Sequence, residues 1–475
     1  MTDPAAYLLE RAWVDGAMRD AVLVEIEDGR FTSVTPDGQS LHLSGNARAD
    51  MFRDPRSAGD PSTPTVIPGL TIPGLANTHS HAFHRALRGR TQRERGSFWS
   101  WRDQMYAVAG RLDPDSYREL ARATYREMAA AGITAVGEFH YLHHQPDGTA
   151  YDEPNSMALA LVEAARDAGI RITLLDTCYL SSGFGEPPTG VQVRYADRDA
   201  GAWVERVRGL DKLDHRGDQP DRRGDVVIGA AIHSVRAVPA EQMTTIAEWS
   251  RQVGPTEGGR PLHVHVSEQV AENRSCVAAY ARTPTEVLAD HGVLGPMTTA
   301  VHATHLTEDD IGLLGGMRTF AAFCPTTERD LGDGIGPSRR LHDAGARLTL
   351  GSDSQAVIDP FEEMRAVELD ERLATQERGH WTAAELVTAA TETGHESLGF
   401  PDAGRIAVGQ RADLVTLAAA SPRTAGTDAD DTTVVFAAVA EDVVQVMVDG
   451  RIVVRQGDRE EIGRELDRAI EGVWA

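Results

Sequence analysis

The sequence predicts an α/β protein built on a (β/α)8 TIM-type barrel, with β-structure at both ends of the chain. Between about residues 70 and 400, eight short apolar runs recur, and helix-like segments separate them. Both ends of the chain instead alternate apolar and polar residues between turn signals, which is typical of short antiparallel strands. The length of 475 residues agrees with this plan, because it exceeds what one small core requires.

Almost every apolar run finishes in a polar residue. The runs are, in order, LTIPGLANTHSH (70–81), ITAVGEFH (133–140), RITLLDTCY (171–179), VVIGAAIHSV (226–235), PLHVHVSE (261–268), TTAVHATH (298–305), TFAAFCPTT (319–327) and ARLTLGSDS (346–354). In such barrels the active site lies at the carboxyl ends of the strands. Ten of the 17 histidines lie in or just after these ends, which predicts one site at the barrel mouth; they are His79, His81, His140, His143, His144, His233, His263, His265, His302 and His305.

The terminal segments predict a second structural unit. Residues 21–38 and 404–417 have strand-like alternation, and 443–457 adds an Asp-Gly hairpin turn. We therefore expect a domain formed by residues 1–68 and 401–475, beside a catalytic barrel over 69–400.

Composition limits the possible partners and compartment. The formal net charge of -25 argues against nucleic acid and anionic membrane surfaces, which require clustered positive charge. No apolar stretch approaches the roughly 20 residues of a membrane span, and we expect a cytoplasmic protein with a small-molecule ligand. The three cysteines are far apart, so any metal must be held by histidine and carboxylate.

Two strand-end motifs predict a metal site. Residues two apart on a strand face the same side, so His79 and His81 can reach one ion. His263 and His265 repeat this spacing, and we choose His265 because it lies nearer the mouth. With Asp353 from GSDS, these side chains suit one catalytic divalent ion, with zinc as the first choice.

These motifs, taken in order, resemble the amidohydrolase superfamily. The resemblance implies that the terminal β-segments pair into a small β-sandwich beside the barrel. Many members hold two metals with a carboxylated lysine from the fourth strand, but Lys212 is the only lysine and precedes that strand, which implies one metal. It also implies that Asp353 takes a proton from the attacking water, Glu268 protonates the substrate nitrogen, and His302 stabilises developing charge.

Arginines near the strand ends suggest an anionic substrate. Arg102 lies in an aromatic stretch after the first strand, and His233 and Arg236 close the fourth, while Tyr141 follows the second. Guanidinium groups pair with carboxylates through two parallel hydrogen bonds, so two converging arginines suit a dianionic ligand.

The longer motifs HSHAF, EFHY, VHATH and LGDGI resemble the formimidoylglutamate deiminase family. That family hydrolyses N-formimino-L-glutamate to N-formyl-L-glutamate and ammonia during histidine degradation, with one zinc ion. The resemblance implies Arg102, Tyr141, His233 and Arg236 as contacts to the substrate carboxylates, and it suggests a homodimer. Many members carry a glutamine where this chain has His84, which we keep as a candidate substrate contact.

Two other hypotheses remain open. A deaminase of heteroaromatic rings, such as guanine or S-adenosylhomocysteine, would need a flat apolar slot with few cations, and the two arginines count against it. A catalytically silent metal-binding barrel would be expected to have lost Glu268, His302 or Asp353, and all three are present.

Overall fold

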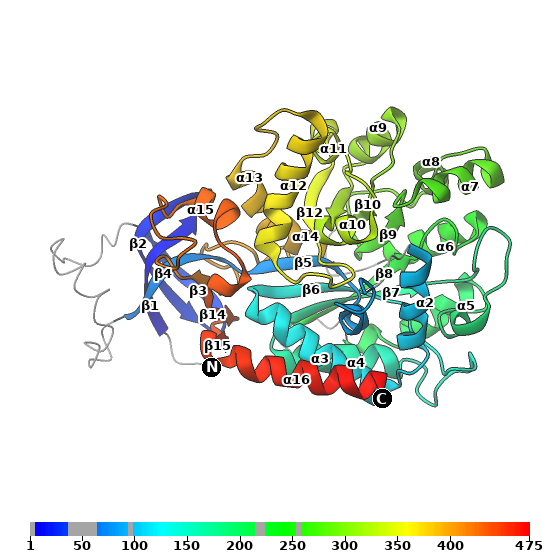
Figure 1. The fold of residues 1–475 in the computed structure, drawn as a ribbon, viewed down its shortest axis with the longest axis horizontal. Coiled ribbons are helices and arrows are strands. Elements are labelled where there is room, and N and C mark those ends of the chain that lie inside the picture. The colour runs from blue at the N-terminus through cyan, green and yellow to red at the C-terminus, as the bar shows by residue number, and fades with distance from the viewer. Residues whose placement is uncertain (1–4, 37–63, 94–97, 214–223, 253–257) are drawn as a thin grey trace.

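The protein contains a parallel barrel and a separate sheet formed by both ends of the chain (Figure 1). The computed structural model describes residues 5–36, 64–93, 98–213, 224–252 and 258–475, so most of the two segments rich in polar residues that we expect to be loops, 42–66 and 211–225, lies outside the described residues. The barrel strands are β5 (Leu75–Ser80), β6 (Ile133–His140), β7 (Arg171–Cys178), β8 (Val226–Ile232), β9 (Leu262–Val266), β10 (Thr298–His302), β11 (Phe320–Phe323) and β12 (Arg347–Leu350). Each predicted run contains one of these strands, which confirms the (β/α)8 prediction.

The barrel closes between its first and last strands. Ser80 and Asp353 form an isolated parallel bridge. The backbone N–H groups of Ser352 and Asp353 donate to the His79 carbonyl at 3.1 and 3.0 Å, and His81 N–H donates to the Asp353 carbonyl at 3.1 Å. The seam is therefore made by the carboxyl end of β5 and the segment that follows β12, and it includes three of the predicted metal ligands.

Amphipathic helices cover the barrel. In α3 (Pro114–Ala130), Asp113 and Ser116 form a capping box, and Tyr117, Leu120 and Met128 belong to its buried face. The remaining helices are α2 (Phe98–Ala109), α4 (Ser156–Ala168), α5 (Ala200–Arg208), α6 (Ala240–Ser250), α7 (Val270–Tyr280), α8 (Pro284–Asp290), α9 (Glu308–Gly316), α10 (Pro325–Leu331), α11 (Ser338–Ala344), α12 (Pro360–Thr375), α13 (Ala383–Thr388), α14 (Gly394–Ser397), α15 (Asp431–Phe436) and α16 (Arg459–Trp474).

The terminal sheet has the order β15-β14-β13-β4-β1-β2-β3. Its strands are β1 (Ala5–Val14), β2 (Ala17–Glu27), β3 (Arg30–Thr35), β4 (Thr65–Pro73), β13 (Leu414–Leu417), β14 (Val443–Val448) and β15 (Arg451–Arg455). Phe31 and Val24 from one end share a core with Leu414 and Met447 from the other, as in the predicted sandwich. The predicted hairpin turn is also present, because Asp449 and Gly450 both have positive φ. Of the expected strand over 404–417, only β13 forms.

One continuous segment serves both sheets. β4 belongs to the terminal sheet and β5 to the barrel, with only Gly74 between them, so β4 crosses the expected boundary at residues 68–69. A Cβ atom at Gly74 would lie 2.3 Å from the Thr134 hydroxyl oxygen, which explains the glycine. The last helix, α16, leaves the terminal sheet and lies along α3, where Arg126 pairs with Glu465 at 2.5 Å (Figure 1).

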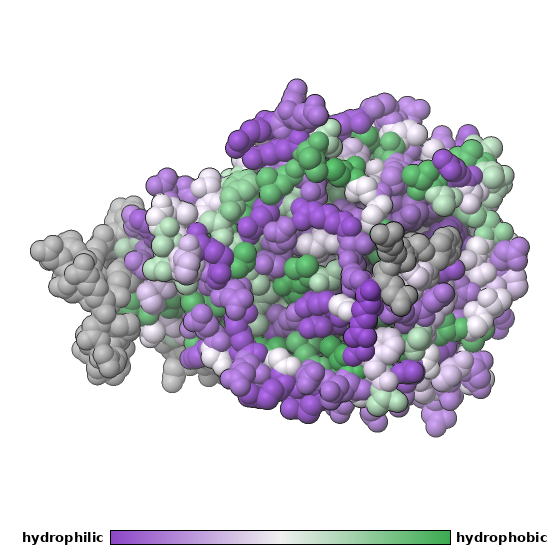
Figure 2. Space-filling model, in the orientation of Figure 1, coloured by the Kyte–Doolittle hydropathy of each residue, from purple (hydrophilic) through white to green (hydrophobic). Residues whose placement is uncertain are grey.

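The visible surface is mainly hydrophilic, and apolar residues form short interrupted stretches on it (Figure 2). Among the described residues, no helix combines the length and apolar character needed to cross a membrane.

Candidate metal and substrate site

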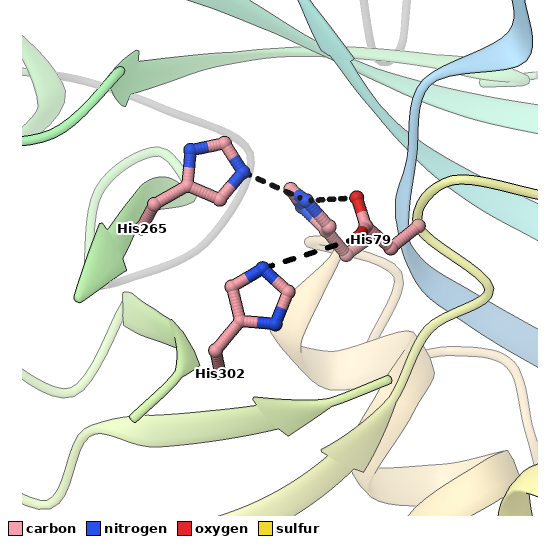
Figure 3. A group of neighbouring side chains, drawn as sticks. His79, His265 and His302 are labelled. Carbon is pink, nitrogen blue, oxygen red and sulfur yellow. Dashed lines mark hydrogen bonds and ion pairs between the residues drawn. The ribbon is translucent and has the colours of Figure 1, made fainter. Parts of the chain in front are cut away.

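Three histidines and one aspartate meet at the barrel mouth. Ligand atoms of His79, His265, His302 and Asp353 all lie within 4.8 Å of one another, and all four side chains are buried. The His79 Nε2 atom is 3.1 Å from the His265 Nε2 atom and 3.2 Å from an Asp353 carboxylate oxygen. Figure 3 shows the three imidazoles, from different strands, turned toward one another.

His81, the remaining predicted ligand, is not a member of this group of four but lies beside Asp353. Its Nε2 atom is 3.3 Å from the same Asp353 oxygen, while its Nδ1 is 3.0 Å from the Phe139 carbonyl. The Nδ1 atom of His265 is likewise 2.8 Å from the His233 carbonyl. A carbonyl can only accept, so the Nδ1 atom of each ring carries a proton and the Nε2 atom is turned toward the His79 and Asp353 side chains.

Burial controls the charges of this group. It lowers the pKa of His79 to about 4 and that of His265 well below its usual range, so both rings are neutral near pH 7. Burial opposes ionisation of Asp353, but its interactions with His79, His81 and His302 outweigh burial and hold the pKa of this carboxyl well below its usual range. Neutral imidazoles beside one carboxylate are a donor set that fits a divalent ion such as zinc.

The backbone is left-handed where these strands end. Ser267, His302 and Asp353 have φ values of 53°, 67° and 41°. Each such conformation costs roughly 1–3 kcal/mol for a residue other than glycine, and strain of this kind concentrates at functional sites. The left-handed residues lie where the strands that supply the metal-site side chains end. This position supports a functional role for the segments that follow those strands.

His302 is surrounded by carboxylates. Its Nε2 atom is 4.0 Å from Glu268 and 3.9 Å from Asp353, and its Nδ1 atom is 3.3 Å from Glu328. Burial alone would lower the pKa of His302, but Glu268, Glu328 and Asp353 raise it to about 10. Glu328 is a residue that the sequence analysis missed, because it lies inside α10 and not at a strand end.

One pocket contains the predicted catalytic and substrate residues. Its lining includes Glu268, His302 and Asp353 together with His84, Arg102, Tyr141, His233 and Arg236. The sequence analysis did not single out several further lining residues, mainly aromatic: Trp101, Met105, Tyr106, Tyr179, Gln192 and Tyr195. These come from α2 and from the segment after β7, where no metal-like or charged motif marks them.

His84 lies in the pocket but also has a protein partner. Its Nε2 atom is 2.9 Å from the Tyr141 hydroxyl, and its ring packs 4.7 Å from the His81 ring. Burial lowers the pKa of His84 well below its usual range, so the ring is neutral. A neutral imidazole here connects the short helix Ala82–Leu87 after His81 to Tyr141, which directly follows β6.

The fold and site geometry agree with the comparisons with known proteins. The model of the amidohydrolase family matches residues 70–453. The chain belongs to this family. A formimidoylglutamate deiminase of Pseudomonas aeruginosa is 33% identical over 438 residues, which cover 90% of this chain and 94% of that protein.

Other similar proteins carry names that differ from formimidoylglutamate deiminase. A 5'-deoxyadenosine deaminase of Methanothermobacter thermautotrophicus is 27% identical and covers 89% of this chain and 90% of its own length. A crystal structure of an amidohydrolase from Brucella melitensis superposes with a TM-score of 0.84 at 28% identity, over 99% of this chain and all of that one. Family membership makes the chain a hydrolase acting on C–N bonds.

The fourth barrel strand of this amidohydrolase has no lysine. Lys212 lies in the turn Asp211–Leu213 and is exposed, and β8 begins only at Val226. The position from which many superfamily members supply a bridging carboxylated lysine is therefore apolar here.

A second polar cluster corrects the prediction of one site for all strand-end histidines. His140, His143 and Asp176 lie close together, yet His140 alternates with the inward-facing Phe139 and points away from the mouth. Trp203 and Arg206 donate three hydrogen bonds of 2.9 Å to Asp176. Arg206 already neutralises the Asp176 carboxylate. We therefore interpret this cluster as a buried polar network and not as a second metal site.

Replacing Arg206 by Met should destabilise this amidohydrolase strongly. Arg206 pairs with Asp176 at 2.9 Å and with Asp197 at 2.7 Å, and all three are buried. Removing one partner of a buried ion pair leaves uncompensated charge and costs about 3–5 kcal/mol. Denaturant unfolding followed by circular dichroism measures this loss. Arg198→Met, at a surface pair with Asp199, is the control, and equal stability of the two variants would contradict the expectation.

Proposed function

We propose that this amidohydrolase is a formimidoylglutamate deiminase, which hydrolyses N-formimino-L-glutamate to N-formyl-L-glutamate and ammonia with one zinc ion. The observation that carries the proposal is the presence of Arg102 and Arg236 in the same pocket as Glu268 and Asp353. The 33% identity to the Pseudomonas aeruginosa enzyme over most of both chains supports it.

The substrate has charges of both signs, and the pocket contains groups that complement them. Its two carboxylates suit guanidinium groups, which donate paired hydrogen bonds. Its formimino group is a strongly basic amidine that carries positive charge near neutral pH, and the carboxylates of Glu268 and Asp353 complement that charge. A neutral heteroaromatic ring would offer the two arginines no carboxylate to bind.

The site residues would divide the hydrolysis between them. A bound divalent ion lowers the pKa of a water molecule toward about 7. Asp353 accepts the proton of the attacking water, and His302 donates a hydrogen bond from Nε2 to the attacking oxygen. Glu268, 4.0 Å from His302, would take up the remaining hydroxyl proton of the added water and deliver it to the departing nitrogen, so that the carbonyl forms and the nitrogen leaves as ammonia. His79, His81 and His265 would hold the ion with Asp353, and because β8 offers no lysine we propose a single ion.

A second candidate is deamination of an adenosine derivative. Trp101, Tyr106 and Tyr195 line the pocket and could stack on a purine, and the Methanothermobacter thermautotrophicus relative has this kind of name. The two arginines weigh against it, since a purine ring offers them no carboxylate.

Ammonia release from a substrate panel tests the proposal. The zinc-loaded protein is incubated with N-formimino-L-glutamate, guanine, 5'-deoxyadenosine and S-adenosylhomocysteine, and a coupled glutamate dehydrogenase assay measures ammonia. We expect turnover of N-formimino-L-glutamate and none of the purines. Turnover of a purine derivative alone would refute the proposed substrate.

An arginine variant supplies the matched comparison for this panel. Arg236→Met retains the length of the side chain and removes its charge, so KM for N-formimino-L-glutamate should rise by at least about tenfold, since hydrogen bonds to charged groups contribute about 1.5–3 kcal/mol. Arg274→Met, an exposed position on α7, should leave KM unchanged. An unchanged KM in Arg236→Met would exclude a carboxylate contact by this arginine.

A further inference from the structure

The orientation of the Gln192 amide is fixed by the protein. Gln192 lies in the turn Gly190–Arg194 after β7, is 7% exposed and lines the pocket. Its Oε1 atom is 3.1 Å from the backbone N–H of Thr189. A backbone N–H can only donate, so this atom is the amide oxygen and the Nε2 group must donate elsewhere.

The Nε2 group of Gln192 donates to two pocket tyrosines. It is 2.9 Å from the Tyr179 hydroxyl and 3.2 Å from the Tyr106 hydroxyl. Each hydroxyl therefore accepts from Gln192 and keeps its own proton to donate. Within the part of the chain that the structure describes, neither hydroxyl has a protein acceptor. Burial raises the pKa of the Tyr179 phenol, which keeps it protonated.

Both tyrosines interact with the pocket arginines. The Arg102 guanidinium lies 5.5 Å from the centre of the Tyr106 ring. Both Arg102 and Arg236 act electrostatically on Tyr179, whose ring packs edge-on against His233 at 4.9 Å. Two neutral donors and two cationic donors are thus gathered in one part of the pocket.

We infer that Gln192 is a positioning residue that makes this part of the pocket a donor-only carboxylate subsite, by directing the hydroxyl protons of Tyr106 and Tyr179 toward the ligand beside Arg102 and Arg236. The identity of the natural ligand rests on the proposed function, but the subsite itself recognises any short dicarboxylate. A carboxylate offers only acceptors and satisfies all four groups. A carboxamide brings an NH2 group against donors and leaves hydrogen bonds unmade, which is how polar sites discriminate strongly.

Glutarate and its monoamide, glutaramate, test the subsite without any reaction. Calorimetry on the zinc-loaded protein measures the dissociation constants of both compounds, and the wild type should prefer glutarate. Gln192→Met has similar volume and cannot donate, so the tyrosine hydroxyls can turn and the preference should fall by about 10-fold, the size of one or two lost hydrogen bonds. Both arginines remain in this variant, so charge alone cannot explain a fall.

Two further variants separate positioning from a general structural effect. Tyr179→Phe should lower the preference by a similar factor, and the double variant should lose less than the product of the two single effects, because both changes remove the same donor. Tyr280→Phe removes a hydroxyl outside the pocket lining and is the control. In turnover, Gln192→Met should raise KM with little change in kcat, as expected for a group that contributes to binding alone.

An unchanged glutarate preference in Gln192→Met, or in Tyr179→Phe should the first variant fail to fold, would overturn the inference. The outcome is distinguishable from failure of the proposed function. Absence of ammonia release from N-formimino-L-glutamate with a preserved, Gln192-dependent preference for glutarate would reject the substrate and retain the subsite. Ammonia release from N-formimino-L-glutamate, together with a glutarate preference that does not depend on Gln192, would retain the proposed substrate and reject the subsite.

Discussion

Glu268→Gln should abolish ammonia release while the protein keeps its full complement of metal. Glu268 lies just after β9, 4.0 Å from His302. It lines the pocket but does not belong to the cluster of His79, His265, His302 and Asp353. Glutamine preserves the shape and cannot deliver a proton to the departing nitrogen. Loss of general acid catalysis lowers kcat by about 10²–10⁴-fold. Kinetic assay and elemental analysis of one preparation measure both quantities.

The comparison variant for Glu268 is Glu241→Gln. Glu241 is exposed in the first turn of α6, so the same chemical change should leave kcat and metal content as in the wild type. Substantial turnover by Glu268→Gln would reject its role as the acid. Loss of metal in that variant would instead show that the carboxylate contributes to the metal site.

Removal of the metal should abolish activity and lower the thermal midpoint of the protein together. An ion that binds the folded state alone stabilises it by about 2.7 kcal/mol at 100 times its dissociation constant. The proposed ligands come from the ends of β5, β9 and β12, so a bound ion would connect distant parts of the chain. Differential scanning fluorimetry after chelation, and after zinc is restored, measures the shift.

A ligand variant distinguishes this effect from nonspecific zinc binding. His79→Ala removes an imidazole that lies 3.2 Å from Asp353, so its thermal midpoint should no longer respond to zinc. Equal midpoints for the chelated and zinc-loaded wild type would contradict the prediction, as would a full zinc response in the variant.

The strands and the metal group were predictable because both follow from short-range patterns. Apolar runs that end in polar residues identify parallel strands, and the two-residue spacing of His79 and His81 places both on one face. His265 is a better candidate ligand than His263 because it lies nearer the mouth of the barrel. His263 is fully buried, and the register of β9 with β10 sets it two residues below His265.

The pocket beyond the metal group was less predictable, because its residues act through contacts between distant segments. Nothing local in the sequence indicates that Gln192 reaches Tyr106 and Tyr179, which precede it by 86 and 13 residues. Glu328 is likewise recognisable as part of the site only from its contact with His302 in the folded protein. The histidine count also misled in one respect, since alternation along β6 turns His140 away from the mouth.

Three of the proposed metal ligands also take part in the seam that closes the barrel between β5 and β12. A parallel sheet that fails to close has two edge strands whose unpaired N–H and C=O groups can recruit another chain. Here the closing hydrogen bonds involve the backbone of His79, His81 and Asp353, the same residues whose side chains would hold the ion. The residues proposed to hold the ion therefore also leave the barrel without a free strand edge at this seam, so a backbone change at His79 or Asp353 would disturb metal binding and barrel closure together.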